Sequence, residues 1–258
     1  PIFHSRRLCT MKSPLRYPGG KSRRAKEILS QLDTEHGLIE PFLGGGSVFL
    51  RDLNGSKDKT FLLNDVNSAL HNLWEQILFD PEELKELILQ ETVDLDKFYQ
   101  IKEGHSNEGY QFLFMNRTSF SGLGENPIGG KEQKSQWTVD CRWNAKVLVS
   151  IIDKIKEHAD KNDVLLYCED FEDFINIATL ERKHLPIYLD PPYVDKGPIL
   201  YRKFFLTSDH TRLAEQLNVL GNEWLLSYDS CELIKELYNE CKITPTNYRY
   251  SISGKKEE

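Results

Sequence analysis

Apolar residues along this chain follow two alternating patterns, a helical stripe and a short uninterrupted run. The first stripe places Ala25, Ile28, Leu29 and Leu32 on one face, with Ser22 positioned to cap the helix and Gly37 to end it. Short apolar runs predict strands at 38–42, 61–64, 164–167, 186–190, 224–227 and 248–251. Helical spacing predicts helices around 70–77 and at 145–159, 208–220 and 230–240. Strands separated by helices indicate an α/β fold with a doubly wound, mostly parallel sheet.

The segment from about 79 to 144 interrupts this alternation, since it contains no convincing buried strand. Asp80 and Pro81 are placed to open a helix, as cap and first-turn residue. Two or three helices then lead into a polar, glycine-rich tract over 116–143, and loops of that length are usually functional or disordered. We therefore expect one core domain from 11–78 and 145–258, with an insertion at 79–144 that is helical and ends in a long loop or hairpin.

The composition excludes several classes of protein. Among the 258 residues, no apolar run approaches the roughly 20 needed to cross a bilayer. The N-terminus lacks the apolar segment of a secretory signal, and Met11 resembles a natural start, so we interpret residues 1–10 as a vector-derived or extended segment. The five cysteines are odd in number and show no Cys-x-x-Cys spacing, which disfavours zinc sites and a disulfide framework. We expect no metal site and a reducing cytosol as the location.

Charge is distributed unevenly along the chain. The net charge is −7, yet residues 1–26 carry eight basic side chains and no acidic one. The remainder therefore sums to −15, with a concentration of acidic residues between 79 and 108. Because screening limits the reach of exposed charges to about 10 Å, a basic face on an acidic body can still bind phosphate. The alternative is a solvated basic arm, and charge alone does not separate the two.

Two glycine-rich turns suggest a nucleotide-like ligand. The first, 19–22, ends like a phosphate loop, but Leu15 stands where that loop needs a glycine and no strand precedes it, which disfavours an ATPase. The second, 40–47, follows a predicted strand, where such a turn lets a nucleotide lie against the sheet's carboxyl edge. It fails as a dinucleotide fingerprint because Phe49 replaces the third glycine. A purely structural turn is the alternative.

Asp65 ends the second predicted strand, nineteen residues after Gly46. At that distance, an acid at a strand tip can accept hydrogen bonds from the hydroxyls of a ribose. The alternative is that Asp65 caps the helix that follows. The sequence supports the two interpretations equally.

The tetrapeptide Asp190-Pro191-Pro192-Tyr193 carries the most specific chemistry. It follows a predicted buried strand, so it lies at the edge where open α/β sheets bind ligands. The two prolines remove two backbone donors and stiffen the turn, which leaves carbonyl oxygens free to accept. An acceptor-only pocket beside an aromatic ring suits the exocyclic amino group of a nucleic-acid base.

Taken in order, these motifs resemble those of the Dam-type adenine-specific DNA methyltransferases. The likeness spans residues 14–254, and its most specific parts are the Tyr-Pro-Gly-Gly-Lys element at 17–21 and the motif at 190–193. It implies a Rossmann-like core that uses S-adenosylmethionine, with target recognition by the insertion at 79–144. One departure is that the family continues with a further apolar strand, whereas this sequence stops at Glu258.

The resemblance also implies roles for individual residues. Asp190 and the carbonyl of Pro191 would accept from the amino group of a flipped-out adenine, in a turn stiffened by Pro192, with Tyr193 stacked on its ring. The cofactor would be held by Tyr17, Lys21, Glu40, Phe42, Gly44, Gly46, Asp65, Asp170, Phe171 and Asp190, although Phe171 alone could be a plain core residue. DNA would be contacted by Arg16, Lys21, Arg23, Asn116, Arg117, Thr118, Ser119, Asn126, Lys131, Gln136, Arg202 and Lys203. Arg117 is the candidate for a guanine contact, and the basic residues at 16–26 would bind phosphates.

The partner implied is double-stranded DNA, bound by a monomer in a prokaryotic or phage-type cytoplasm. The resemblance leaves open whether a cognate restriction endonuclease accompanies the chain. Two alternatives are a catalytically silent DNA-binding subunit of the same fold and an RNA or protein-glutamine methyltransferase. The protein-glutamine enzymes usually carry asparagine at the position of Asp190, which argues against them.

Overall fold

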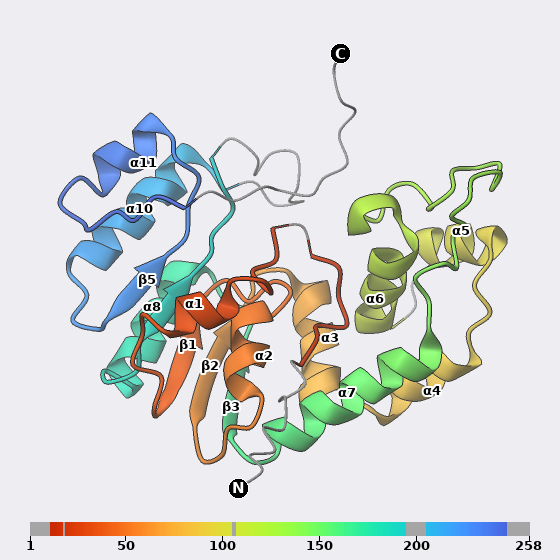
Figure 1. Ribbon diagram of the computed structural model, residues 1–258, viewed down its shortest axis with the longest axis horizontal. Helices are drawn as coiled ribbons and strands as arrows, with labels where there is room; N and C mark the ends of the chain where they lie inside the picture. The colour runs from red at the N-terminus through yellow and green to blue at the C-terminus, as the bar shows by residue number, and fades with distance from the viewer. Residues whose placement is uncertain (1–10, 18, 105–106, 195–204, 247–258) are drawn as a thin grey trace, which may run out of the picture.

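The computed structural model describes residues 11–17, 19–104, 107–194 and 205–246, which form an α/β structure on a parallel sheet (Figure 1). The strands are β1 (Gly37–Glu40), β2 (Thr60–Asn64), β3 (Asp163–Tyr167), β4 (Ile187–Leu189) and β5 (Trp224–Leu226). The helices are α1 (Ala25–Leu29), α2 (Ser47–Leu53), α3 (Ser68–Leu78), α4 (Glu82–Gln90), α5 (Leu95–Glu103), α6 (Glu108–Thr118), α7 (Ala145–Ala159), α8 (Phe171–Glu181), α10 (Thr207–Asn218) and α11 (Glu232–Leu237). The predicted strand at 248–251 and the segment 1–10 lie outside the described residues. None of the described helices is long and apolar enough to cross a membrane.

The sheet has the strand order β3-β2-β1-β4-β5, and every neighbouring pair is parallel. The chain runs outward from β1 to β3 and then returns to the other side of β1 through β4 and β5. The order therefore reverses between β1 and β4. In open α/β sheets, ligands bind in the crevice outside the carboxyl ends of the strands at such a reversal. The predicted parallel sheet is confirmed for the five described strands.

Both faces of the sheet are covered by helices, because the strands send alternate apolar side chains to opposite sides. Leu38, Phe61 and Tyr188 belong to the core shared with α1, α2, α3 and α7. Their neighbours Ile39 and Leu62 belong to a second core, formed with α8, α10 and α11. The predicted winding on both faces therefore holds for the described part of the chain.

Helix α1 and strand β1 begin differently from the prediction. Ser22 does not cap α1: Arg24 occupies the N-cap position, without a side-chain hydrogen bond, and the helix ends at Leu29. Gly37 does not end a helix but opens β1 with φ +136°. A Cβ atom there would lie 1.7 Å from the carbonyl oxygen of Thr60, so the close approach of β1 to β2 requires glycine.

Two helices were missed by the sequence prediction. Helix α2 follows the glycine turn and has only seven residues, with the apolar Val48, Phe49 and Leu50 consecutive, so it is too short to show a helical stripe. Helix α8 carries a clear signal, since Asp170 caps it and Phe171, Phe174, Ile175 and Ala178 are buried at helical spacing. The stripe at 171–178 could therefore have been identified from the sequence.

Three helices occupy 82–118, which confirms the expectation of two or three. Helix α4 packs on α7, and α6 packs on both α3 and α5. Figure 1 shows α4 to α7 gathered on one side of the sheet, away from α8, α10 and α11. Helix α4 starts at Glu82 with Pro81 rather than Asp80 in the N-cap position. The segment after α6 makes one antiparallel bridge, Ser119 to Pro127, and the role of 79–144 as an insertion stays a prediction.

Candidate active site

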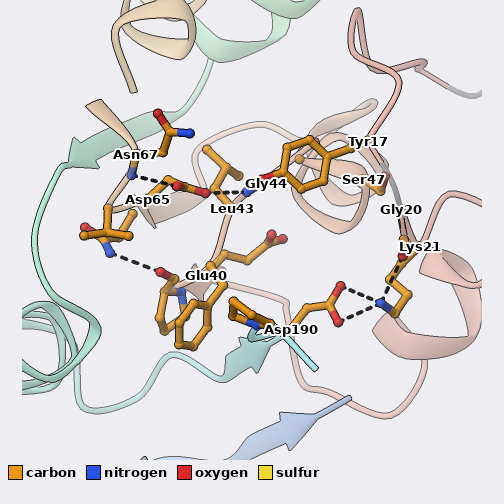
Figure 2. Close-up of a pocket in the computed structure, with 18 of the residues that line it drawn as sticks. Tyr17, Gly20, Lys21, Glu40, Leu43, Gly44, Ser47, Asp65, Asn67 and Asp190 are labelled. Carbon is orange, nitrogen blue, oxygen red and sulfur yellow. Dashed lines mark hydrogen bonds and ion pairs between the residues drawn. The ribbon is translucent and has the colours of Figure 1, made fainter. Parts of the chain in front are cut away.

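A cavity of about 310 Å³ lies at the carboxyl edge of the sheet, where the strand order reverses. Figure 2 shows side chains converging on it from the segment before α1, from the ends of β1 and β2, and from the turn after β4. The structure brings together at this cavity all ten residues predicted to hold a cofactor, from Tyr17 and Lys21 to Phe171 and Asp190. These residues lie up to 173 positions apart in the sequence, so the fold, and not proximity along the chain, makes them neighbours.

Asp190 follows β4 and forms an ion pair with Lys21. The Lys21 Nζ lies 2.6 Å from each Asp190 carboxylate oxygen, and it also donates to the carbonyl of Gly19 at 3.1 Å (Figure 2). Burial raises the pKa of Asp190, whereas Lys21 and a hydrogen bond with the Tyr193 side chain counteract that rise. The turn that contains Gly19 and Gly20 therefore positions Lys21 beside Asp190.

Glu40 ends β1 beside Asp190 and is only 2 % exposed. Its Oε1 is buried and has no hydrogen-bond partner among the described residues. Burial raises the pKa of Glu40 well above its ordinary value, and the nearby charge of Asp190 adds to the rise, while a hydrogen bond from the Phe49 backbone opposes it. The cavity wall thus carries a carboxyl group that favours its neutral form and has acceptor capacity to spare.

Two aromatic side chains, Tyr17 and Trp74, pack against the glycine turn after β1. A Cβ atom on Gly45 would lie 2.8 Å from the Tyr17 side chain, and one on Gly46 would lie 2.7 Å from the Trp74 ring. Trp74 also donates from Nε1 to the carbonyl of Gly44 at 2.9 Å. These glycines let the backbone approach protein side chains as well as the cavity.

Asp65 lies at the end of β2 and faces the cavity. Its carboxylate accepts from the backbone N–H of Gly44 at 2.9 Å and from that of Asn67 at 3.0 Å. Asn67, not Asp65, caps α3 by accepting from the backbone N–H of Leu70. The helix-cap interpretation of Asp65 is therefore wrong, and the carboxylate instead fixes the glycine turn against the tip of β2.

Asp170 and Phe171 form the far wall of the cavity. Asp170 caps α8 through the backbone N–H of Glu172 and pairs with Arg212 at 2.8 Å. The Arg212 guanidinium also lies over the Phe171 ring, 4.9 Å from its centroid. Phe171 packs against Phe42 and Phe205, with centroid separations of 5.7 and 5.3 Å. Arg212 was not predicted to belong to this site, and Phe205 was not predicted to pack on the cofactor residues.

Tyr193 is supported by residues that follow β5. Its ring lies 6.1 Å from that of Tyr228, and Lys21 Nζ lies 5.1 Å from its centroid. The Tyr228 hydroxyl is 2.6 Å from Nδ1 of the buried His210. The backbone N–H of Val194 donates to Asp229 at 3.2 Å. The turn formed by the Asp-Pro-Pro-Tyr motif is therefore held in place by residues that follow β5.

Comparison with known proteins assigns this arrangement to a family. Residues 17–252 match the family described as D12 class N6 adenine-specific DNA methyltransferases. The chain belongs to this family. The methyltransferase is 25 % identical to a DNA adenine methylase of Escherichia coli K12, over 93 % of this chain and 88 % of that protein. It is 25 % identical to a DNA adenine methylase of Haemophilus influenzae, over 95 % and 88 %, and 26 % identical to the type II methyltransferase M1.LlaDCHI of Lactococcus lactis, over 88 % and 84 %.

The family membership makes this chain an adenine-specific DNA methyltransferase, as the resemblance implied. It favours DNA over the RNA and protein-glutamine alternatives, and an enzyme over a silent subunit. The family also implies S-adenosylmethionine as the methyl donor.

Several side chains expected to contact DNA are buried and form hydrogen bonds within the protein. Asn116 is buried; its amide accepts from the backbone N–H of Arg16 at 2.8 Å and donates to the Arg16 carbonyl at 3.0 Å. Thr118 and Ser119 are fully buried, and their hydroxyls bond to the Phe114 carbonyl and the Gly124 backbone N–H. A direct base contact by these three side chains would require the segment to rearrange, and their DNA-binding role stays a prediction.

Arg117 is similarly engaged. Its Nε and Nη2 donate to the carbonyl of Arg142 at 3.0 and 2.6 Å, and its Nη1 lies 3.4 Å from the carbonyl of Pro14. Burial, together with the charges of Arg16 and Arg142, lowers the pKa of Arg117 to about 10. Lys21, also expected to contact DNA, is buried and paired with Asp190, and its DNA-binding role stays a prediction. The other predicted contacts that the structure describes are exposed, namely Arg16, Arg23, Asn126, Lys131 and Gln136. Arg202 and Lys203 lie outside the described residues.

Asn64 is a positioning residue that the sequence interpretation did not single out for a role. It is buried at the tip of β2, and its amide donates to the carbonyls of Pro41 and Glu169, both at 3.0 Å. Its oxygen accepts from the Glu169 backbone N–H at 2.9 Å. Asn64 therefore ties together the chain segments that carry Glu40, Asp65 and Asp170. Its place directly before Asp65 was the available signal.

Proposed function

We propose that the methyltransferase acts on duplex DNA by rotating the target adenine out of the base stack and into the cavity beside Asp190. The observation that carries this proposal is the placement of Asp190 and Glu40 at the ends of β4 and β1, on a cavity shared with all the predicted cofactor residues. The amino group of a paired adenine is not accessible inside a duplex, and enzymes that act on a base extrude it first.

The cavity fits S-adenosylmethionine. The buried Glu40 Oε1, without a partner among the described residues, offers an acceptor to the ammonium group, and the turn of Gly44 and Gly46 has the positive φ that close backbone approach needs. We propose that Glu40 and this turn hold the methionine part, that Asp65 accepts from the ribose, and that Asp170 and Phe171 bind the adenine ring. When bound, S-adenosylmethionine supplies an electrophilic methyl group on a sulfonium.

The role proposed for Asp190 and the Pro191 carbonyl is to orient the target amino group. An adenine amino nitrogen is a weak nucleophile because its lone pair is delocalised into the ring. Two acceptors that hold its N–H groups out of the ring plane would localise the lone pair, and this alignment could supply up to roughly 7–11 kcal/mol in favourable cases. Asp190 then stabilises the developing positive charge and need not deprotonate the amine beforehand. Tyr193 stacks on the adenine.

Lys21 is proposed to keep Asp190 ionised until the base arrives. Its ammonium occupies one acceptor position on each carboxylate oxygen, and a carboxylate offers about four such positions. An amino group can therefore bind Asp190 without displacing Lys21. The same ion pair offsets the cost of burying the carboxylate between substrates.

The segment 79–144 is proposed to recognise the target sequence, as a unit joined to a core of 11–78 and 145–258. Asn126, Lys131 and Gln136 are exposed on the loop that follows α6, and amide or ammonium groups of this kind can donate to base edges in the major groove. Asn116 and Gly122, at the base of that loop, also line the cavity. The loop therefore leaves the protein directly beside the proposed place of the flipped base.

The proposal is tested by incubating the purified protein with unmethylated genomic DNA and S-adenosylmethionine, then sequencing the DNA for modified bases. We expect N6-methyladenine in one short motif, and none in the reaction without cofactor. Methylation of single-stranded DNA with none in the duplex would contradict base flipping, because an unpaired base needs no extrusion from the stack. Absence of methylation from a folded, cofactor-binding protein would contradict the activity on DNA.

We also propose, as a second context, that the modification protects DNA from a cognate restriction endonuclease, because the Lactococcus relative is a type II methyltransferase. DNA methylated by this protein should then resist an endonuclease that cleaves the same unmodified motif. Cleavage of both substrates at equal rates would restrict the enzyme to a role without that partner.

A further inference from the structure

Three arginines from distant parts of the chain meet beside the active-site cavity. Arg16 lies before α1, Arg117 lies on α6, and Arg142 lies just before α7. Arg117 donates to the backbone carbonyl of Arg142, and its neighbour Asn116 bonds to the backbone of Arg16. The charge of Arg16 lowers the pKa values of both Arg117 and Arg142, after the larger effect of burial in each case. The three guanidinium groups therefore lie within electrostatic reach of one another.

This cluster is held rigidly by α6. Asn116 uses both amide atoms on the N–H and C=O of Arg16, at 2.8 and 3.0 Å, which fixes the backbone of that residue as a paired strand would. Arg117 fixes the other segment by donating twice to the carbonyl of Arg142. Gly122 completes the frame, since its φ is +77° and a Cβ atom there would lie 2.6 Å from the Arg16 carbonyl oxygen. The side chains of Arg16 and Arg142 are thus projected from fixed backbone positions.

The cluster has no acidic counterpart in the described part of the chain. None of the ion pairs there involves Arg16, Arg117 or Arg142, whereas Arg24 and Arg212 each pair with carboxylates. Acidic residues are abundant, since Asp and Glu outnumber Lys and Arg by 40 to 33. Like charges held close together raise the energy of the free protein, and a bound anion relieves that repulsion. The arrangement favours a ligand with negative charge.

We propose that Arg16 and Arg142 bind a phosphodiester group of the DNA backbone next to the target adenine, with Arg117 as the buried anchor that holds them. The cluster borders the cavity through Asn116 and Gly122, which line it, so a phosphate bound there would lie close to the proposed place of the flipped base. A guanidinium matches the geometry of a phosphate through paired N–H donors. The inference rests on the proposed action on duplex DNA and adds Arg142 to its contacts.

Affinity measured against salt concentration tests this site. A duplex that contains the motif recognised by the enzyme is titrated with the protein and with its Arg16→Gln and Arg142→Gln variants over a range of salt concentrations. Each variant should lower the slope of log affinity against log salt by about one and weaken binding about 3- to 10-fold, because each loses one phosphate contact. Arg182→Gln is the matched control: Arg182 lies near Asp163 at the start of β3, at the opposite edge of the sheet. It should leave the slope unchanged.

A set of duplexes, each with one phosphate neutralised, locates the phosphate that the arginines bind. Single phosphates around the target adenine are replaced, one at a time, by neutral methylphosphonate groups. Replacement at one position should weaken DNA binding by the wild-type protein, and the same replacement should not weaken binding by Arg142→Gln any further. Arg142→Lys keeps the charge and should retain the slope, which separates loss of the contact from misfolding.

Two results would overturn the inference. One is an unchanged salt slope in both glutamine variants. The other is an altered methylated motif in either of them, because a residue that only binds phosphate carries no sequence information. If the wild-type protein methylates nothing, the proposed function fails, while the salt slopes still decide whether these arginines contact DNA.

Discussion

The cavity wall and the loop over 119–143 are both rich in glycine and polar residues, but they use them in opposite ways. At the cavity, the buried Glu40 Oε1 has no partner in the described structure. In the loop, Ser119 and Gln133 form hydrogen bonds within the loop itself. The Ser119 hydroxyl accepts from the backbone N–H of Gly124, and the Gln133 amide donates to the carbonyls of Ile128 and Gly130 and accepts from the N–H of Val139. Glu40 therefore keeps an acceptor oxygen available to a ligand at the cavity, whereas Ser119 and Gln133 use their polar atoms to fix the shape of the loop.

This difference shows where function can be located. An unpartnered buried polar atom costs free energy in the folded protein. Where such an atom also lines a cavity, as Glu40 Oε1 does, it is a candidate to bind a ligand, whereas the unpartnered Trp143 Nε1 and Tyr238 hydroxyl do not line this cavity. Internally satisfied side chains carry no such indication. In the loop, only the exposed side chains are directly available to DNA, and they include Asn126, Lys131, Gln136 and the apolar Phe120 and Trp137.

The largest effect is expected from Asp190→Asn, because it removes the charge at the centre of the cavity while keeping the shape of the side chain. The turnover number should fall by about 10²- to 10³-fold, the loss typical of removing one preorganised electrostatic group. Duplex binding should remain measurable, which a filter or fluorescence assay can check. Turnover close to that of the wild type would show that Asp190 is not central to the reaction, and it would weaken the comparison between the cavity and the loop.

Asp65→Ala should weaken cofactor binding without a comparable effect on DNA binding. The carboxylate would accept charge-assisted hydrogen bonds from the ribose and also holds the Gly44 turn, so we expect the dissociation constant to rise roughly 10- to 100-fold. Calorimetric titration with S-adenosylmethionine measures it. Asp65→Asn is the control, since it keeps one acceptor oxygen and should lose less. An unchanged dissociation constant in Asp65→Ala would limit Asp65 to holding the turn.

Arg117→Ala tests whether Arg117 stabilises the protein through its hydrogen bonds. Removal of the guanidinium leaves the carbonyl of Arg142 without its two donated bonds, which should cost about 1–3 kcal/mol of stability. For a chain of this size, the melting temperature should fall by about 2–4 °C for each kcal/mol lost. Cofactor affinity should not change. A relaxed methylation motif with an unchanged melting temperature would instead show that Arg117 reads a base.

The smallest effect is expected from Glu40→Gln, and it depends on pH. The folded-state pKa of Glu40 is raised well above 4.5 by burial and by Asp190, so above pH 4.5 the unfolded chain releases a proton that the folded chain retains. Stability contributed by Glu40 therefore falls as pH rises through this window. Glutamine carries no such proton, so the variant should gain melting temperature relative to wild type as pH increases from 4.5 towards neutrality.

Below pH 4.5 the two proteins should melt alike, because Glu40 is then neutral in both states. The same substitution should weaken cofactor binding, since the neutral amide cannot become a carboxylate opposite an ammonium group. A melting temperature that drops at neutral pH would mean that the Glu40 carboxyl is paired and stabilising, contrary to the unpartnered oxygen described above.

The sequence was sufficient for the parallel sheet and for the residues that gather at its edge. Strand ends are easily located from short apolar runs, and the carboxyl ends of parallel strands meet at one edge by geometry. Glu40, Asp65 and Asp190 follow such runs directly, so their convergence on one cavity could be expected. The helix after Asp170 was also legible from its stripe, although the prediction omitted it.

The tertiary structure decided which polar side chains are available. Asn116, Arg117, Thr118 and Ser119 look like a row of base-reading donors in the sequence, yet long-range contacts with 14–16 and Arg142 engage the first two, and burial encloses the others. The partners of these groups lie up to about a hundred positions away, which no local pattern reveals. The pairing of Lys21 with Asp190, 169 positions apart, was likewise set by the fold. Local sequence thus determined the elements and the chemistry of their ends, whereas hydrogen bonding between distant segments determined which groups face a ligand.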